Sequence, residues 1–152
     1  MQKLAAMMLA LIAPLLLAGC NAGAADNRIP LTITHNGKAH NFRVEVARTQ
    51  EEQARGLMER TSLPEDGGML FPFEAPKIAS FWMEKTLIPL DMIFVRKDGS
   101  IDRIAENTIP NSREPVVSGG EVSAVLELAG GTAARLGLDE SATVTWKDSA
   151  VQ

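Results

Sequence analysis

Residues 80–91, SFWMEKTLIPLD, place three charged side chains within one of the most apolar parts of the chain. Glu84 and Asp91 are carboxylates, and Lys85 lies between them. A charge removed from water costs free energy unless it is paired or hydrogen-bonded, so these residues need partners. Such a cluster is typical either of a binding or catalytic site or of an ion pair that holds a turn.

A further carboxylate, Glu127, lies in the apolar segment VSAVLEL. Side chains alternate between the two faces of a strand, so Glu127 and Asp91 each have apolar neighbours on their own face. The available cations are Arg55 and Arg60, at the end of a predicted short helix, and Lys85. We therefore expect Asp91 to be held by Arg60 or Arg55 at the rim of the fold.

Trp82 stands beside these charges and offers an aromatic surface. An aromatic platform with a few convergent polar groups is the usual composition of a small-ligand site, which Trp82, Asp91 and Arg60 would form together. The alternative interpretation is that Trp82 belongs to the core and that Asp91 and Arg60 form a structural clamp for the turn.

An alternative hypothesis is that the carboxylates are catalytic. Asp91 paired with Glu84 or Glu127 would suit acid–base hydrolysis of a glycan if the groups stood about 5–9.5 Å apart across a cleft. The sequence has no nucleophile elbow and no HExxH motif. His35 and His40 fall short of a structural zinc set, and methionines such as Met83 are expected in the core. No metal and no cofactor is predicted.

The elements that would position these residues are predominantly strands. Asn36-Gly37 lies between two alternating runs and predicts a hairpin, and Thr49 with Glu52 forms a capping box for a short helix. We predict strands at 31–34, 42–46, 69–73, 79–84, 90–95, 100–104, 122–128 and 143–146, and helices at 49–58 and 130–136. A parallel α/β fold would need long crossover helices, which are not predicted. The expected fold is mainly β, a single-domain β-sandwich or partly open barrel of about seven short strands with two short helices.

The first residues read as a targeting segment. Lys3 is followed by a short uncharged run and by small residues, which is the layout of a secretory signal, and the run is too short to span a bilayer. Residues 17–20, LAGC, resemble the bacterial lipobox, in which the cysteine is lipidated after cleavage. An ordinary signal peptide is the alternative. Cys20 is the only cysteine in the chain.

Three regions follow from this interpretation. We expect residues 1–19 to be a lipoprotein signal peptide, residues 20–28 to be a flexible tether and residues 29–148 to be one mainly β domain. The protein would be anchored in the cell envelope by a lipid on Cys20. Asn21 resembles a residue that permits sorting to the outer membrane, where the domain would face the periplasm in a Gram-negative cell.

The net charge is −4, with 15 basic and 19 acidic residues. No run of basic residues of the kind that follows a phosphate backbone is present. We therefore expect no nucleic acid among the partners.

Five motifs in order carry a family resemblance: EQARGLMER, GGMLFPF, FWMEKTLIPLDMIF, a DG turn and VLELAGGTAARLGL. From about residue 42 to 146 the chain resembles the domain-of-unknown-function 192 family. The resemblance implies a compact, mainly β domain, frequent on exported proteins, without an established activity. The residues that match the family pattern and are candidates for ligand binding are Arg55, Arg60, Trp82, Thr86, Asp91 and Glu127.

The predicted function is that of an uncharacterised cell-envelope lipoprotein domain which binds a small ligand or envelope component at a rim site near Trp82. One alternative is a structural or partner-docking lipoprotein. A second is a carboxylate-based hydrolase that acts on envelope glycans.

Overall fold

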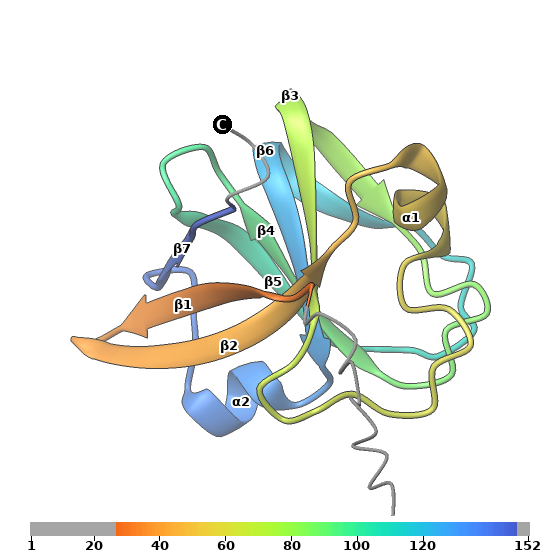
Figure 1. The fold of residues 1–152 in the computed structure, drawn as a ribbon, viewed down its shortest axis with the longest axis horizontal. Helices are drawn as coiled ribbons and strands as arrows, with labels where there is room; N and C mark the ends of the chain where they lie inside the picture. The colour runs from red at the N-terminus through yellow and green to blue at the C-terminus, as the bar shows by residue number, and fades with distance from the viewer. Residues whose placement is uncertain (1–26, 149–152) are drawn as a thin grey trace, which may run out of the picture.

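Seven strands and two short helices make up residues 27–148, the part of the chain that this computed structural model describes (Figure 1). They are β1 (Ile29–His35), β2 (Lys38–Val46), α1 (Gln50–Arg55), β3 (Met69–Phe81), β4 (Leu90–Val95), β5 (Ile101–Thr108), β6 (Val116–Ala129), α2 (Thr132–Leu136) and β7 (Thr143–Trp146). The predicted signal peptide 1–19, Cys20 and nearly all of the tether 20–28 lie outside the described residues. Within 27–148 no helix has the length and apolarity needed to cross a membrane.

All seven strands belong to one sheet, in the order β5-β4-β6-β3-β2-β1-β7. Every neighbouring pair is antiparallel except β2 and β3, which pair in parallel over two residues each. The edge strand β7 reaches the turn before β5 through one bridge, between Ser100 and Thr143. Gly99 has a φ of 85°, and a Cβ there would lie 2.6 Å from the Val144 carbonyl oxygen, so this approach requires glycine.

The sheet therefore curls until its edges approach each other but does not close. The prediction of a mainly β domain with two short helices is confirmed. The parallel pair was not predicted. Residues 47–68 connect β2 to β3 and contain α1, a crossover with only one short helix.

Local sequence signals for the first hairpin and helix are confirmed. Asn36 and Gly37 have φ values of 49° and 74°, as a tight hairpin turn between β1 and β2 requires. Thr49 caps α1, because its hydroxyl accepts from the Glu52 backbone N–H and the Glu52 carboxylate accepts from the Thr49 backbone N–H. Gly56 ends this helix with a positive φ of 48°.

Apolar side chains fill both sides of the sheet. Alternate residues of β4 point to opposite faces, and all six are buried. Ile93 and Val95 belong to a cluster with β1, β2 and β7, whereas Met92 and Phe94 belong to a second cluster beneath α1. A strand covered on both faces explains why five of the six residues in LDMIFV are apolar, with Asp91 as the exception.

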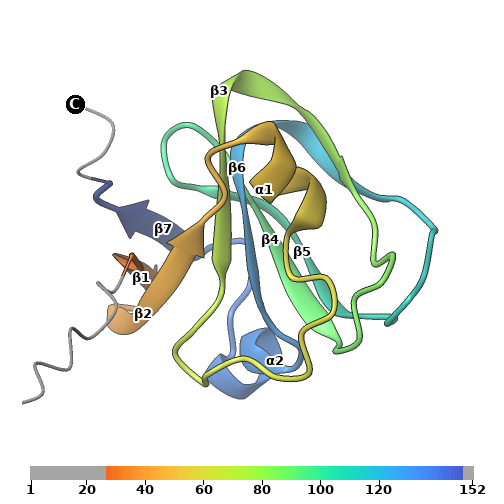
Figure 2. The same ribbon diagram turned by 45° about the vertical axis from the view of Figure 1, so that its right-hand side comes forward.

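The structure corrects the prediction of separate strands at 69–73 and 79–84. β3 is one strand that runs from Met69 to Phe81 and pairs with β6, which begins at Val116. Register shifts between Pro72 and Lys77 let the two prolines in this region stay within the strand. Proline is tolerated at such irregularities because they do not need every backbone N–H. The resulting bend lies next to α1 (Figures 1 and 2).

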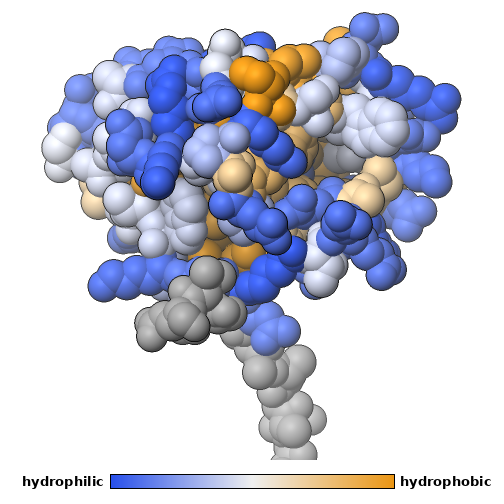
Figure 3. Space-filling view, turned by 90° about the horizontal axis from the view of Figure 1, so that it is seen from above, coloured by the Kyte–Doolittle hydropathy of each residue, from blue (hydrophilic) through white to orange (hydrophobic). Residues whose placement is uncertain are grey.

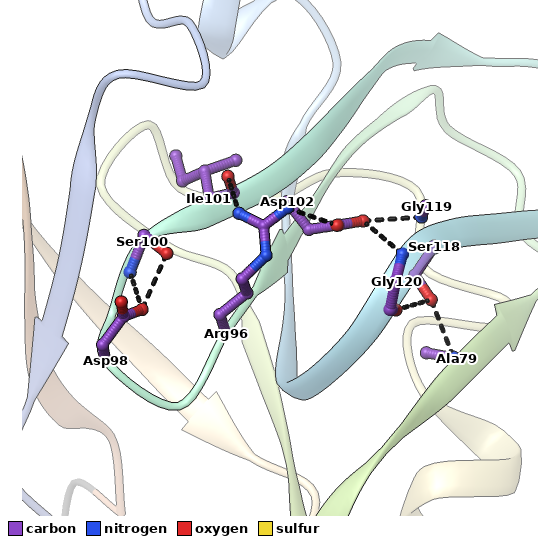
Figure 4. A network of polar contacts seen from close by, with 9 residues as sticks. All are labelled: Ala79, Arg96, Asp98, Ser100, Ile101, Asp102, Ser118, Gly119 and Gly120. Atoms are coloured by element: carbon purple, nitrogen blue, oxygen red, sulfur yellow. Dashed lines mark hydrogen bonds and ion pairs between the residues drawn. The ribbon is translucent and has the colours of Figure 1, made fainter.

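A polar network fastens the β4–β5 hairpin to β6 (Figure 4). The Asp102 carboxylate accepts from the Gly119 backbone N–H at 2.6 Å and from Arg96 at 2.6 Å. Ser118 accepts from the Ala79 backbone N–H at 3.0 Å and donates to the Gly120 carbonyl at 2.7 Å. Because these groups satisfy one another, we interpret the network as structural.

Candidate functional site

A cavity of about 500 Å³ lies between α1 and the bend of β3. That volume is within the range of small-molecule pockets. Figure 2 shows α1 over this part of the sheet, and Figure 3 views the molecule from this end, where apolar surface appears between hydrophilic side chains. The cavity is lined by Gln53, Ala54, Arg55, Gly56, Leu57, Met58, Phe71, Phe73, Lys77, Ser80, Phe81, Trp82, Thr86, Arg113, Pro115 and Glu127.

The loop after α1 forms one wall. Leu57 is 2% exposed and anchors the loop in the second core cluster. Gly56 brings the backbone close to the sheet, since a Cβ there would lie 3.2 Å from the Phe71 ring and 4.0 Å from Glu127 Oε2. The Gln53 side chain donates to the carbonyls of Ala47 and Pro72, which fixes the helix against β3.

The loop between β3 and β4 also lines the cavity and is tied to its surroundings by backbone hydrogen bonds. The Glu59 N–H donates to the Lys85 carbonyl at 2.8 Å, and the Asn111 N–H donates to the Thr86 carbonyl at 3.0 Å. Met83 is 1% exposed and anchors this loop from below. Thr86 therefore lines the cavity from a fixed backbone.

Aromatic rings provide most of the apolar lining. Phe71 and Phe81 meet edge to face, with ring centroids 5.1 Å apart. The Lys77 ammonium group lies 4.0 Å from the centroid of the Phe73 ring, a cation–π contact. Trp82 is 53% exposed at the mouth of the cavity, so it is not a core residue.

Glu127 supplies the carboxyl group inside the cavity. The residue is 4% exposed, and its strand neighbours Met69 and Met92 are apolar. No hydrogen bond or ion pair between residues of the described region involves this carboxyl. Burial raises the pKa of Glu127 to about 8, so the group is mainly protonated and neutral at neutral pH. It is then a hydrogen-bond donor that faces an open space.

Three cationic side chains also line the cavity. Arg55 comes from the last turn of α1, Lys77 from β3 and Arg113 from the segment before β6. Arg113 forms an ion pair with Glu84 at 2.8 Å. Arg55 is exposed and makes no ion pair or side-chain hydrogen bond within residues 27–148. Its guanidinium is therefore available to a ligand.

Asp91 does not belong to this cavity. It is fully buried, with Oδ1 accepting from the backbone N–H groups of Asn107 at 2.8 Å and Gly131 at 3.1 Å, and Oδ2 accepting from that of Ala133 at 2.7 Å. The predicted pairing of Asp91 with an arginine at the rim is wrong. Three backbone donors satisfy the carboxylate instead and fasten β4 to β5 and to the start of α2.

Arg60 also lies outside the cavity lining. Both of its terminal nitrogens donate to the Glu45 carboxylate on β2, one of them at 2.7 Å. This bidentate ion pair fixes the part of the loop after α1 that contains Arg60. Of the six candidate residues, Arg55, Trp82, Thr86 and Glu127 therefore surround one cavity, whereas Arg60 and Asp91 support the surrounding fold.

The carboxylate pairs considered for hydrolysis do not meet. Met92 is the register partner of Glu127, and Asp91 is that of Leu128, so the two carboxyl groups point to opposite faces of the sheet. Glu84 is occupied by Arg113. Glu127 is the single carboxyl-bearing residue in the cavity lining. Within 27–148 no group of three or more His, Cys, Asp or Glu residues could hold a metal ion.

Comparisons with known proteins identify the family. The family DUF192, described as an uncharacterized ACR, matches residues 31–146. The chain belongs to this family. Its structure is similar to that of a protein of unknown function from Novosphingobium aromaticivorans DSM 12444, at 46% sequence identity and a TM-score of 0.76, covering 78% of this chain and 85% of that one. Curated proteins yield no match.

A second similar solved structure is that of a protein from Sinorhizobium meliloti 1021 described as a putative transcription regulator. It is 36% identical, with a TM-score of 0.76, and the match covers 78% of this chain and 93% of that one. Both matches extend over most of those proteins, so they share the fold described above.

Several lining residues were not predicted from the sequence. Lys77 and Arg113 are isolated cations in segments with no motif, and Phe71 reads as an ordinary core residue. The bend of β3 and the bond from the Met83 N–H to the Ser112 carbonyl at 2.9 Å bring them to the cavity. Neither feature has a sequence signal.

Proposed function

We propose that this DUF192 domain binds a small organic ligand in the cavity between α1 and β3, with Trp82 covering the bound molecule. The observation that carries the proposal is the Glu127 carboxyl, which lines an aromatic-rich cavity of about 500 Å³ and makes no hydrogen bond or ion pair with another described residue. Buried polar groups normally have partners, and a ligand would supply one here. Arg55 at the rim offers a second polar contact.

The shape of the lining limits the ligand. Phe71, Phe81 and Trp82 favour a molecule with a flat or apolar body, and the few polar groups would fix its orientation. Because the walls are held by the capped helix α1 and by backbone hydrogen bonds, the cavity exists before a ligand arrives. Preorganisation of this kind lowers the entropic cost of binding.

A thermal-shift screen of the purified full chain tests this proposal. The compounds are small aromatic and aliphatic acids, amides and amines, sugars and peptidoglycan fragments. We expect at least one class to raise the unfolding temperature of the wild type. We expect Trp82→Ala to abolish that increase without lowering the unfolding temperature of the free protein by much, since Trp82 is half exposed. An equal increase in the variant, or none in the wild type, would contradict a site at Trp82.

We further propose that the domain acts in the cell envelope, held by a lipid on Cys20 through the tether 20–28. The support is the sequence LAGC after a short apolar segment. In a Gram-negative cell the domain would face the periplasm from the outer membrane, where its ligand would be a small envelope or periplasmic molecule. Nucleic acid is not among the proposed partners, given the net charge of −4.

A further inference from the structure

Glu127 and the rim cations together define which ligands the cavity can accept. The Glu127 carboxyl lies inside the cavity, is 4% exposed and has no hydrogen-bond partner within the described region. Arg55, Lys77 and Arg113 surround the opening. A neutral carboxyl beneath a positively charged rim favours an anionic ligand and disfavours a cationic one.

We propose that the cavity selects organic carboxylates, with the protonated Glu127 donating a hydrogen bond to the ligand carboxylate and Arg55 providing the compensating charge. This inference rests on the proposed ligand-binding function and adds the chemical class of the ligand. The interaction is a hydrogen bond between a carboxylic acid and a carboxylate, in which no covalent bond changes. Charge-assisted hydrogen bonds of this kind are the strong ones.

The surroundings of Glu127 support a neutral state in which it can donate. On the two neighbouring strands its register partners are Met69 of β3 and Met92 of β4, and both are buried. The charged groups that face the cavity from the other elements are Arg55, Lys77 and Arg113. Burial raises the pKa of Glu127 to about 8, and no neighbouring charge contributes to this shift.

The pocket geometry also limits where the ligand carboxylate can lie. A Cβ on Gly56 would lie 4.0 Å from Glu127 Oε2 and 3.2 Å from the Phe71 ring, so the loop after α1 closes over the carboxyl on one side. The rings of Phe71, Phe81 and Trp82 line the same cavity. A carboxylate joined to a flat apolar body would place its charge at Glu127 and its body against the rings.

Binding should therefore depend on pH. The ionised Glu127 would repel a ligand carboxylate, so only the protonated fraction of the protein binds. The apparent Kd rises as that fraction falls, by about tenfold for each pH unit above about 8. Carboxylic acids of ordinary pKa remain ionised over this range, so the dependence reports on the protein.

Three probes of matched size separate the charge classes: phenylacetate, the neutral phenylacetamide and the cationic phenethylamine. The full chain carrying Trp146→Phe retains Trp82 as its sole tryptophan, so fluorescence reports on the cavity. We expect phenylacetate to change this fluorescence saturably and to bind at least tenfold more tightly than the other two at about pH 6–7. Preferential binding of phenethylamine or phenylacetamide overturns the carboxylate proposal but leaves ligand binding intact. If none of the three binds while the thermal-shift screen finds a ligand of another class, the carboxylate proposal fails and ligand binding stands; if the screen also finds no ligand, both proposals fail.

Variants at Glu127 test the role of its proton. Glu127→Gln keeps a neutral hydrogen-bond donor, so phenylacetate should bind within a few-fold of the wild-type affinity and lose the pH dependence above about 8. Glu127→Leu removes the donor and should weaken binding by about tenfold or more. A pH dependence that persists in Glu127→Gln overturns the proposal.

Arg55→Gln tests the compensating charge, with Arg135→Gln as its matched control. Arg135 is an exposed arginine on α2, outside the lining of this cavity, and its loss changes the net charge equally. We expect Arg55→Gln to weaken phenylacetate binding several-fold and Arg135→Gln to leave it unchanged. Equal effects of the two substitutions overturn the role of Arg55.

Discussion

Replacement of Glu127 by glutamine is expected to stabilise the protein at neutral and alkaline pH. Folding raises the pKa of this carboxyl from 4.5 to about 8, so the folded state retains a proton that the unfolded state releases. The contribution of Glu127 to stability is therefore highest below about pH 4.5, falls as the pH rises towards about 8, and then levels off. Glutamine has nearly the same volume and does not ionise.

The two pKa values set the size of the effect. Between these two pKa values, each pH unit lowers the free energy of unfolding by about 1.4 kcal/mol. Glu127 therefore lowers it by roughly 3 kcal/mol at about pH 7 and by roughly 5 kcal/mol above about pH 8. Glu127→Gln should recover most of this loss and match the wild type near pH 4. A typical domain has only about 5–15 kcal/mol of stability, so the change is large.

Urea unfolding of the wild type and Glu127→Gln at several pH values measures this difference. Glu121→Gln is the matched control, because Glu121 lies exposed on the same strand β6 and makes no ion pair within the described residues. We expect the control to differ from the wild type by less than about 0.5 kcal/mol at every pH. A Glu127→Gln variant that is less stable than the wild type at about pH 8 would refute a desolvated, unpartnered carboxyl.

Three further predictions concern the hydrogen bonds of Asp91, the role of Trp82 at the mouth of the cavity and the lipidation of Cys20. Asp91→Asn should lower the free energy of unfolding, measured by urea denaturation, by roughly 2–4 kcal/mol, because the new amide group faces a buried backbone N–H. A loss below about 1 kcal/mol would contradict a stabilising role for these hydrogen bonds. Trp82→Phe should change the free energy of unfolding by less than about 1 kcal/mol and weaken phenylacetate binding measured by isothermal titration calorimetry. An unchanged affinity would contradict a contact between Trp82 and the ligand. Cys20→Ser should release the protein from the membrane fraction and prevent labelling with radioactive palmitate, whereas persistent labelling would exclude Cys20 as the lipidation site.

Local signals predicted those parts of the fold that depend on a few adjacent residues. The turn at Asn36-Gly37, the Thr49 capping box and the buried strand β4 all follow from residue type and spacing. The continuity of β3 could not be predicted in this way, because a proline such as Pro72 indicates the end of a strand unless the register shift that accommodates it is known. The short parallel pairing of β2 with β3 depends on the whole crossover and has no local signature.

For the side chains of the candidate site, too, the local sequence did not reveal contacts with residues far away along the chain. The sequence indicated correctly that Asp91 and Glu127 stand among apolar neighbours, but proximity to arginines along the chain suggested ion pairs that do not form. Asp91 is satisfied by backbone N–H groups, which every residue carries and which therefore leave no trace in the sequence. Arg60 is oriented towards Glu45 on a strand 15 residues away.

The most direct test of the site is the titration of the Glu127 carboxyl carbon by NMR in the full chain, without and with saturating phenylacetate. We predict a midpoint of about 8 for the free protein and a higher midpoint with phenylacetate bound, because the ligand carboxylate stabilises the protonated form. The ordinary pKa of a glutamate carboxyl is 4.5. A Glu127 midpoint near that ordinary value, unchanged by phenylacetate, would contradict a neutral carboxyl that binds an organic anion.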